Sequence, residues 1–180
     1  MNPTEDDLCR AFANKLKESP EFASWLLDRT GFSGDRSRAR LLHEEQVRRR
    51  PHVDAENWWR HWHSAQVKKS GRGQETDIFL VFEPTESKKR FALFIENKKR
   101  RVLSKREADE FREQAEAYEP RARFMRNKHE FLSYDDFVTV LVAPIAFRNG
   151  YIATCDLFNF YIAYENVANF IPDYHVSVLR

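Results

Sequence analysis

Two short apolar runs stand out in the pattern of hydrophobic and polar positions along the chain. Residues 78–82 and 91–95 are rich in β-branched and aromatic side chains, and the polar segment 83–90 between them contains Pro84 and Ser87. This pattern predicts two antiparallel strands joined as a hairpin. In such a hairpin, the residue before the first strand lies beside the residues that end the second strand.

The C-terminal half continues the alternation of strands and helices. Residues 137–143 form a nearly continuous apolar run that ends before Pro144, as expected of a buried central strand. A further strand is predicted over 158–163 and a short helix over 164–171. Because a helix is predicted between residues 91–95 and this central strand, the two strands should pair in parallel through a right-handed crossover.

The crossover helix has clear start and stop signals. Ser104 and Glu107 have the spacing of a capping box, and a helical stripe then continues to about Tyr118. Because the residue before a proline disfavours the helical conformation, we expect the helix to end before Pro120. Residues 121–128 would then form a basic connector.

The N-terminal 29 residues predict one or two helices. Thr4 and Asp7 have the spacing of a helix cap, and apolar residues at helical spacing follow. Ser19 and Pro20 interrupt this spacing.

Residues 31–52 are rich in arginine, and we expect a helical segment that ends at Pro51. The arginines can contact phosphate groups, or they can form a solvated helix face balanced by Glu44 and Glu45. The sequence favours neither interpretation. These arginines are Arg36, Arg38, Arg40, Arg48, Arg49 and Arg50.

A tryptophan-rich segment follows. Asp54 is a good N-cap, and Trp58, Trp59 and Trp62 have helical spacing. Burial in the core is favoured over stacking on nucleic-acid bases.

Composition bounds the class of protein. The chain has 180 residues, 42% hydrophobic and 32% charged, with a net charge of +2. We expect one domain over residues 1–180, with a helical N-terminal part (1–72) and a core (73–180), in the α/β class with a mixed central sheet flanked by helices. The charge is too balanced for a uniformly basic surface, and no apolar run reaches membrane length. Cys9 and Cys155 show no metal-binding spacing, so we expect reduced thiols and a cytoplasmic protein.

Charged side chains lie at one end of the predicted hairpin. Asp77 precedes the first strand, and Glu96, Asn97 and Lys98 follow the second apolar run. Side chains alternate along a strand, so Glu96 and Lys98 should share one side while Asn97 projects away. Two carboxylates and the Asn97 carbonyl suit Mg²⁺, and a neighbouring lysine can orient water, act on its proton or stabilise charge on a phosphate.

These residues resemble the D…(D/E)-x-K core of the PD-(D/E)XK nuclease superfamily. Asp77, Glu96 and Lys98 match that core, although Thr76 stands where the superfamily name has proline. Gln114 and Tyr118 match the Q-x-x-x-Y signature of its RecB-like branch, and Gly73 completes a G-x-x-x-D pattern with Asp77. The resemblance covers about residues 73–165.

The resemblance implies a restriction-endonuclease-like fold and a metal-dependent nuclease that hydrolyses phosphodiester bonds, with DNA as the expected substrate. The catalytic set would be Asp77, Glu96, Lys98, Gln114 and Tyr118. Mg²⁺ or Mn²⁺ would be held by Asp77, Glu96 and the Asn97 carbonyl. An acidic residue on the first helix often joins such a site, which points to Glu5, with Glu44 or Glu45 as competitors.

Basic residues flank both halves of this predicted site and are the expected nucleic-acid contacts: Lys68, Lys69, Arg72, Lys99, Arg100 and Arg101. Two alternatives stay open, namely a nuclease-fold module that binds nucleic acid or protein without cleavage, and a toxin-like RNase. The sequence separates neither endonuclease from exonuclease nor monomer from homodimer, and it predicts no membrane partner.

Overall fold

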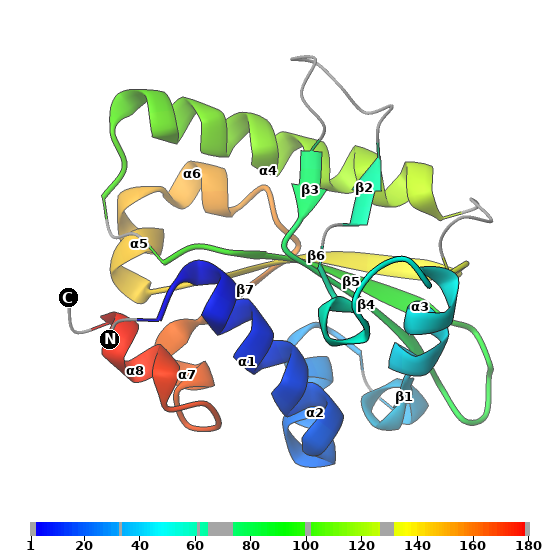
Figure 1. Ribbon diagram of the computed structural model, residues 1–180. Helices are drawn as coiled ribbons and strands as arrows, with labels where there is room; N and C mark the ends of the chain where they lie inside the picture. Colours follow the sequence, from blue (N-terminus) through cyan, green and yellow to red (C-terminus); the bar gives the residue numbers. More distant parts are fainter. Residues whose placement is uncertain are drawn as a thin grey trace.

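A five-stranded mixed sheet with helices on both faces forms the centre of the molecule (Figure 1). The computed structural model describes residues 3–32, 34–60, 62–64, 74–99, 102–126 and 132–178. The strands of the sheet, in spatial order, are β1 (Arg40–Leu41), β4 (Ile78–Glu83), β5 (Phe91–Asn97), β6 (Asp136–Ala143) and β7 (Phe160–Ala163). A separate antiparallel pair consists of β2 (Trp62–Ser64) and β3 (Gln74–Thr76).

The strand directions agree with the sequence prediction. β1, β4 and β5 pair in antiparallel fashion, and β5, β6 and β7 pair in parallel. The hairpin of β4 and β5 and the parallel crossover from β5 to β6 are therefore confirmed. The class, an α/β protein with a mixed central sheet flanked by helices, is confirmed as well.

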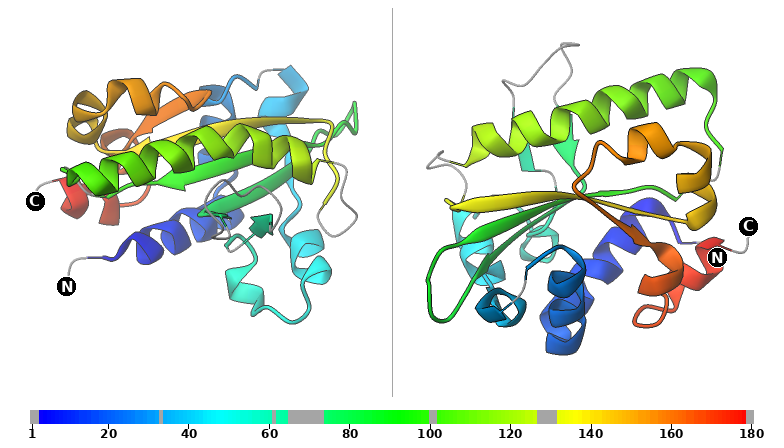
Figure 2. Two further views of the ribbon diagram at one scale, coloured as in Figure 1. Left: turned by 90° about the horizontal axis from the view of Figure 1, so that it is seen from above. Right: turned by 180° about the vertical axis from the view of Figure 1, so that it is seen from behind.

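The two faces of the sheet carry different helices (Figure 2). One face packs on α1 (Glu5–Glu18), α2 (Pro20–Arg29), α7 (Tyr164–Val167) and α8 (Asp173–Val178). The other packs on α4 (Lys105–Met125), α5 (Ile145–Gly150) and α6 (Ile152–Cys155). The remaining helices are α3 (His43–Arg49) and the 3-10 turns η1 (Gly34–Arg38) and η2 (Ala55–Asn57).

Strand alternation decides which side chains meet which layer. Along β5, Leu93 and Ile95 belong to the core beneath α1, while Ala92 and Phe94 belong to the core beneath α4. Glu96 continues the α4 series and Asn97 the α1 series. The end of β5 therefore presents polar groups to two different helices.

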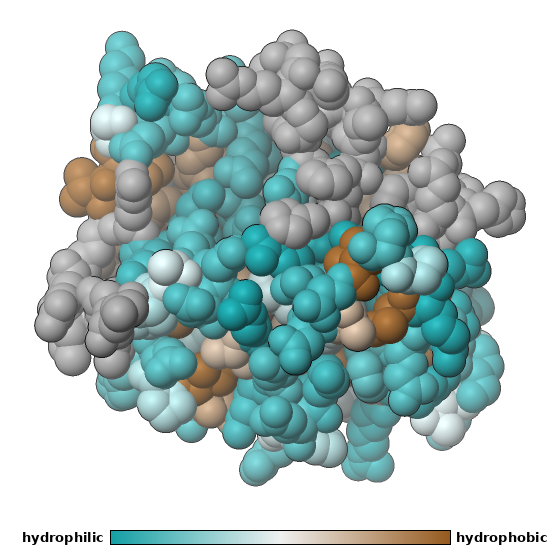
Figure 3. Space-filling model, viewed as in Figure 1, coloured by the Kyte–Doolittle hydropathy of each residue, from teal (hydrophilic) through white to brown (hydrophobic). Residues whose placement is uncertain are grey.

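The outer surface that Figure 3 shows is mostly hydrophilic among the coloured residues, with small separate hydrophobic areas. No helix in the described ranges combines the length and apolarity needed to span a bilayer.

The sequence predicts a helical N-terminal part, but the structure also contains a strand and 3-10 turns there. The arginine-rich segment contains η1, the short strand β1 and α3 in place of one helical segment. Its arginines are partly committed to ion pairs: Arg36 pairs with Asp136 at 2.8 Å, and Arg40 pairs with Glu83 at 3.3 Å. These contacts tie the segment to the sheet.

The tryptophan-rich segment also differs from its predicted helix. Only a 3-10 turn forms after Asp54, and Trp62 begins β2. The backbone of Phe79 donates to the carbonyl of Trp59 at 2.8 Å, which holds the segment against β4. Trp58 and Trp59 are nonetheless buried in the core, as predicted.

The prediction that the crossover helix ends before Pro120 is wrong. α4 begins at its predicted Ser104 capping box but continues through Pro120 to Met125. Ala122 and Met125 are fully buried in the core that also contains Tyr118. Burial of this extended stripe offsets the loss of one helical hydrogen bond, so tertiary packing overrides the local preference.

Pro120 should therefore destabilise the folded protein locally. We expect Pro120→Ala to raise the free energy of unfolding by about 1–3 kcal/mol, because alanine restores the missing N–H and removes the ring clash with the preceding turn. Urea unfolding followed by circular dichroism measures this change. Glu113→Ala, at an exposed position of the same helix, is the control and should change stability by less than about 0.5 kcal/mol. A less stable Pro120→Ala variant would contradict the expectation.

Candidate functional site

The hairpin register brings Asp77 to the end of β5. Ile78 pairs with Ile95, so Asp77 lies opposite Glu96 one position further along the ladder. The backbone N–H of Asn97 donates to Oδ2 of Asp77 at 2.8 Å. The predicted meeting of these two segments is confirmed.

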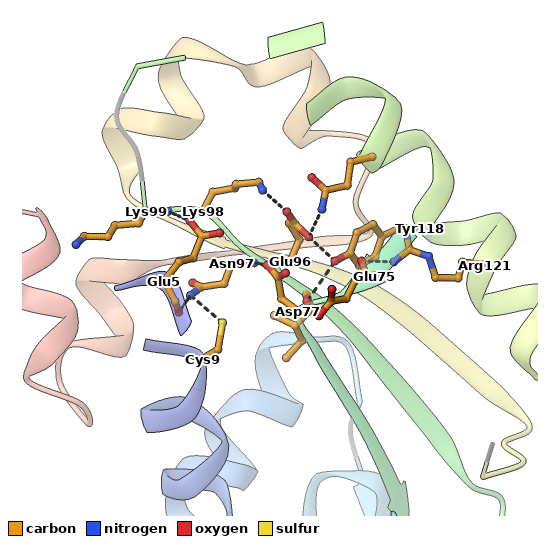
Figure 4. A network of polar contacts seen from close by, with 12 residues as sticks. Glu5, Cys9, Glu75, Asp77, Glu96, Asn97, Lys98, Lys99, Tyr118 and Arg121 are labelled. Carbon is orange, nitrogen blue, oxygen red and sulfur yellow. Dashed lines mark hydrogen bonds and ion pairs between the residues drawn. The ribbon is translucent and has the colours of Figure 1, made fainter. Parts of the chain in front are cut away.

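The Glu96 carboxylate contacts three side chains of the site (Figure 4). Its side chain is fully buried, and Nζ of Lys98 lies 2.5 Å from its Oε1. Its Oε2 accepts from Nε2 of Gln114 at 3.0 Å and from the hydroxyl of Tyr118. Glu96 and Lys98 therefore share one side of the strand, as strand alternation predicted.

Two of these partners come from one face of α4. Gln114 and Tyr118 are four residues apart, so they lie one above the other on the helix. Tyr118 is fully buried, and its ring packs against Phe158 at a centroid distance of 5.1 Å. Packing of the helix thus delivers both donors to the same carboxylate oxygen.

Asn97 faces the opposite layer and binds α1 to the sheet. Its Nδ2 donates to Sγ of Cys9 at 3.2 Å and to the carbonyl of Glu5 at 3.4 Å. Its Oδ1 accepts from the hydroxyl of Tyr164 at 2.7 Å. A buried amide with this many partners fixes the start of α1 beside the site.

The structure shows which of the candidate acidic residues Glu5, Glu44 and Glu45 lies near Glu96. The carboxylate of Glu5 accepts from the backbone N–H of Lys99 at 3.2 Å, so Glu5 borders the site. Glu45 instead pairs with Arg90, which immediately precedes β5, at 3.1 Å. That position is at the other end of the strand from Glu96. Of the three candidates on the N-terminal helices, Glu5 is therefore the one that borders the Glu96 end of β5 in the described part of the chain.

Burial and mutual repulsion act on the carboxylates. Burial, then the negative charge of Glu96, raises the pKa of Asp77 well above its usual range. Burial alone lowers the pKa of Lys98, but Glu96, Asp77 and Glu5 outweigh it and raise that pKa above the ordinary value. Burial and Glu96 also raise the pKa of Tyr118, so this hydroxyl stays a hydrogen-bond donor. The surroundings therefore favour the protonated, neutral form of Asp77.

Two hollows adjoin these groups, with Glu5 on the wall of both. The larger, about 520 Å³, is lined by Lys98, Lys99, Gln114 and neighbouring residues of α4. The smaller, about 50 Å³, is lined by Asp77 and others. The larger hollow is of the size of a ligand pocket, and the smaller has room for a few water molecules at most.

The donor set fits a hard divalent cation in its chemistry, because buried carboxylates in excess of cationic partners attract one. Oε2 of Glu96 accepts two hydrogen bonds, whereas the buried Oε1 accepts none from the described residues and has only the ion pair with Lys98, so a cation at Oε1 would compete with the Lys98 ammonium. Among the described residues, no three His, Cys, Asp or Glu side chains are grouped as a formed metal site. A cation at Glu96 would therefore displace the Lys98 ammonium from Oε1, while Asp77 and Glu96 keep their places.

Most of the predicted nucleic-acid contacts fall outside the described residues, namely Lys68, Lys69, Arg72, Arg100 and Arg101, as does Gly73. Lys99 is described. Its ammonium donates to the carbonyl of Pro3, and its backbone binds Glu5. Lys99 thus fastens the N-terminus to the end of β5 while it lines the larger hollow.

Sequence reasoning missed Arg121 and Tyr164. Arg121 was assigned to a basic connector, but it is a fully buried helical residue. Arg121 is three residues from Tyr118 and seven from Gln114, so the three residues lie on the same helical stripe. This spacing is a signal in the sequence that Arg121 belongs to the helix. Tyr164 gave no comparable signal, because its contact with Asn97 depends on the return of the chain after β7.

Comparison of the chain with protein-family models, with curated proteins and with solved structures gave no match.

Removal of the Asp77 charge should stabilise the protein in metal-free buffer. Because the folded state raises the pKa of Asp77, its ionisation opposes folding. This penalty is absent below about pH 4, where the carboxyl group is protonated in both states, and it grows as the pH rises through the folded-state pKa. Asn at this position can still accept from the Asn97 N–H.

We therefore expect Asp77→Asn to raise the free energy of unfolding at pH 7.5 by about 1 kcal/mol, a typical gain when a functional charge is removed. The gain should vanish as the pH is lowered to about 4. Urea unfolding with a chelator present measures both values. Asp136→Asn is the control: it loses the ion pair with Arg36 and should show no gain. A gain for Asp77→Asn that is independent of pH would contradict the assigned cause.

Proposed function

We propose that this protein is a metal-dependent nuclease that hydrolyses phosphodiester bonds, with DNA as its substrate and a restriction-endonuclease-like fold. The observation that supports this most is the convergence of Lys98, Gln114 and Tyr118 on the buried carboxylate of Glu96, with Asp77 opposite. These are the residues that resemble the superfamily motifs. The motifs are separate in the sequence and contact one carboxylate in the fold.

Asp77 and Glu96 would hold Mg²⁺ or Mn²⁺, with the Asn97 carbonyl and Glu5 as further oxygen donors. A bound divalent cation supplies a more acidic water and neutralises negative charge on the phosphate. The chain fixes both carboxylates beforehand, since the Asn97 N–H holds Asp77 and α4 holds Glu96. Such preorganisation lowers the cost of charge that develops in the reaction.

Lys98 would act on the substrate side of Glu96. Its side chain is partly exposed, its ammonium is directed by Glu96, and it lies 5.7 Å from the ring centroid of Phe111. It also lines the larger hollow, next to Gln114. A phosphate in that hollow would meet the ammonium as a hydrogen-bond donor, which stabilises negative charge electrostatically.

One observation favours the rival function, a module that binds nucleic acid without cleavage. Gln114 and Tyr118 donate to Oε2 of Glu96, the Lys98 ammonium pairs with Oε1, and no group of three potential ligand side chains is formed in the described part of the chain. In this arrangement Lys98 neutralises Glu96 in the place of a cation. Binding and cleavage must therefore be measured separately.

The test combines four substrates with two metals. Plasmid, linear duplex DNA, single-stranded DNA and single-stranded RNA are incubated with purified protein in Mg²⁺, Mn²⁺ or excess chelator. We expect cleavage of DNA that requires the metal. Asp77→Asn, Glu96→Gln and Lys98→Met should each lower the rate by about 100-fold or more, as for loss of other preorganised charged groups.

Arg123→Met is the matched control, because Arg123 is exposed on α4 and forms an ion pair with Glu119, four residues earlier on the same helix. Its rate should stay within about twofold of wild type. Undiminished DNA cleavage by Lys98→Met and Asp77→Asn would contradict the proposal. Retardation of DNA in a gel without cleavage would support the rival module, and preferential cleavage of RNA would support the toxin-like RNase.

A further inference from the structure

A buried arginine anchors the chain just before Asp77. Nη1 of Arg121 donates to the carbonyl of Glu75 at 2.6 Å and to Oγ1 of Thr76 at 2.8 Å. Both acceptors belong to the end of β3, and Asp77 is the next residue. Arg121 and Thr76 are each fully buried.

The same guanidinium also contacts the residue that holds Glu96. Its central carbon lies 4.7 Å from the ring centroid of Tyr118, and the Tyr118 hydroxyl donates to Glu96 (Figure 4). One side chain of α4 therefore joins the strand that leads into Asp77 to the tyrosine that binds the second carboxylate.

The geometry has a simple origin in the helix. Positions 114, 118 and 121 are separated by four and three residues, so they form one stripe along α4. The first two reach the end of β5, and the third reaches the end of β3. Burial of a guanidinium is costly, and Nη1 of Arg121 offsets part of that cost with two hydrogen bonds that an apolar side chain could not make.

We propose that Arg121 is a positioning residue that sets the place of Asp77 relative to Glu96. It acts through the end of β3 on one side and through Tyr118 on the other, and it does not itself touch the reacting groups. The positional role stands on the contacts alone. Its consequence for catalysis rests on the proposed nuclease function.

A metal-free measurement tests the positional role directly. The Asn97 N–H donates to Asp77, whereas the adjacent Lys98 N–H donates to the carbonyl of Val142 on β6. Hydrogen exchange of these two neighbouring amides therefore distinguishes a displaced Asp77 from general fraying of β5. The experiment is run with chelator present, so it does not depend on nuclease activity.

We expect Arg121→Met to speed exchange of the Asn97 amide by about tenfold while the Lys98 amide changes little. Arg121→Lys should give an intermediate effect, because one ammonium can donate to the same two acceptors but lacks the planar guanidinium that lies beside Tyr118. Thr76→Val removes the Oγ1 acceptor with little change of shape and should act in the same direction. In the double variant with Arg121→Met, Thr76→Val should speed exchange of the Asn97 amide by less than it does alone. Both substitutions remove the same contact between Arg121 and Thr76.

Arg123→Met, two residues further along α4, is the control and should leave both amides unchanged. Should Arg121→Met fail to fold, Arg121→Lys and Thr76→Val carry the test. Equal acceleration of the Asn97 and Lys98 amides, or no change in either, would overturn the positional role.

A kinetic arm tests the catalytic consequence. With DNA and Mg²⁺, we expect the Arg121 variants to lower kcat by about tenfold with little change in KM, because substrate contacts are intact and the carboxylates are misplaced. A change confined to KM would overturn this consequence. If wild-type protein cleaves nothing, the proposed function fails, while the exchange result still decides the positional role.

Discussion

The burial of the Glu96 carboxylate is the constraint on which the rest of this site depends. A charge removed from water is tolerated only where partners replace its hydration. Here those partners come from two elements that follow one another in the chain: Lys98 just beyond β5, and Gln114 with Tyr118 on α4. The crossover from β5 to β6 contains α4, and packing of this helix places the donors of Gln114 and Tyr118 beside the end of β5.

The two acids of the site are held in unlike surroundings. Glu96 faces α4 and has three protein partners, whereas the Asp77 carboxylate accepts a hydrogen bond from the Asn97 backbone. Burial and the charge of Glu96 raise the pKa of Asp77, so the folded state works against its ionisation. A fold that keeps such a group gains no stability from it. Functional sites commonly retain unfavourable groups of this kind because their chemistry requires them.

Sequence patterns predicted the parts of the structure that local rules control. The hairpin, the buried strand over 137–143 and the Ser104 cap follow from periodicity and turn chemistry, and they place Asp77 beside the end of β5. Alternation along one strand sufficed to separate Glu96 from Asn97. These features need no knowledge of distant segments.

The parts that were mispredicted depend on tertiary packing. Pro120 carries a real local penalty, but burial of Ala122 and Met125 outweighs it, and with the longer helix Arg121 moves from a supposed linker into the core. The choice between Glu5 and Glu45 was likewise open in the sequence, since both stand on acidic helix starts. It is decided by which helix lies at the Glu96 end of β5. Trp62 shows the same dependence, because its place in β2 is set by pairing with Thr76.

The order of motifs in a sequence carries less information than their convergence in space. E-x-K, Q-x-x-x-Y and a preceding aspartate are each short enough to arise by chance, and their order alone says nothing about contact. In this fold Lys98, Gln114 and Tyr118 all touch the carboxylate that lies opposite Asp77 in the hairpin register. A helix that only covered the sheet would not need both an amide and a phenol in contact with one buried carboxylate. The shared target is therefore a stronger argument for a common chemical purpose than the match of any one motif.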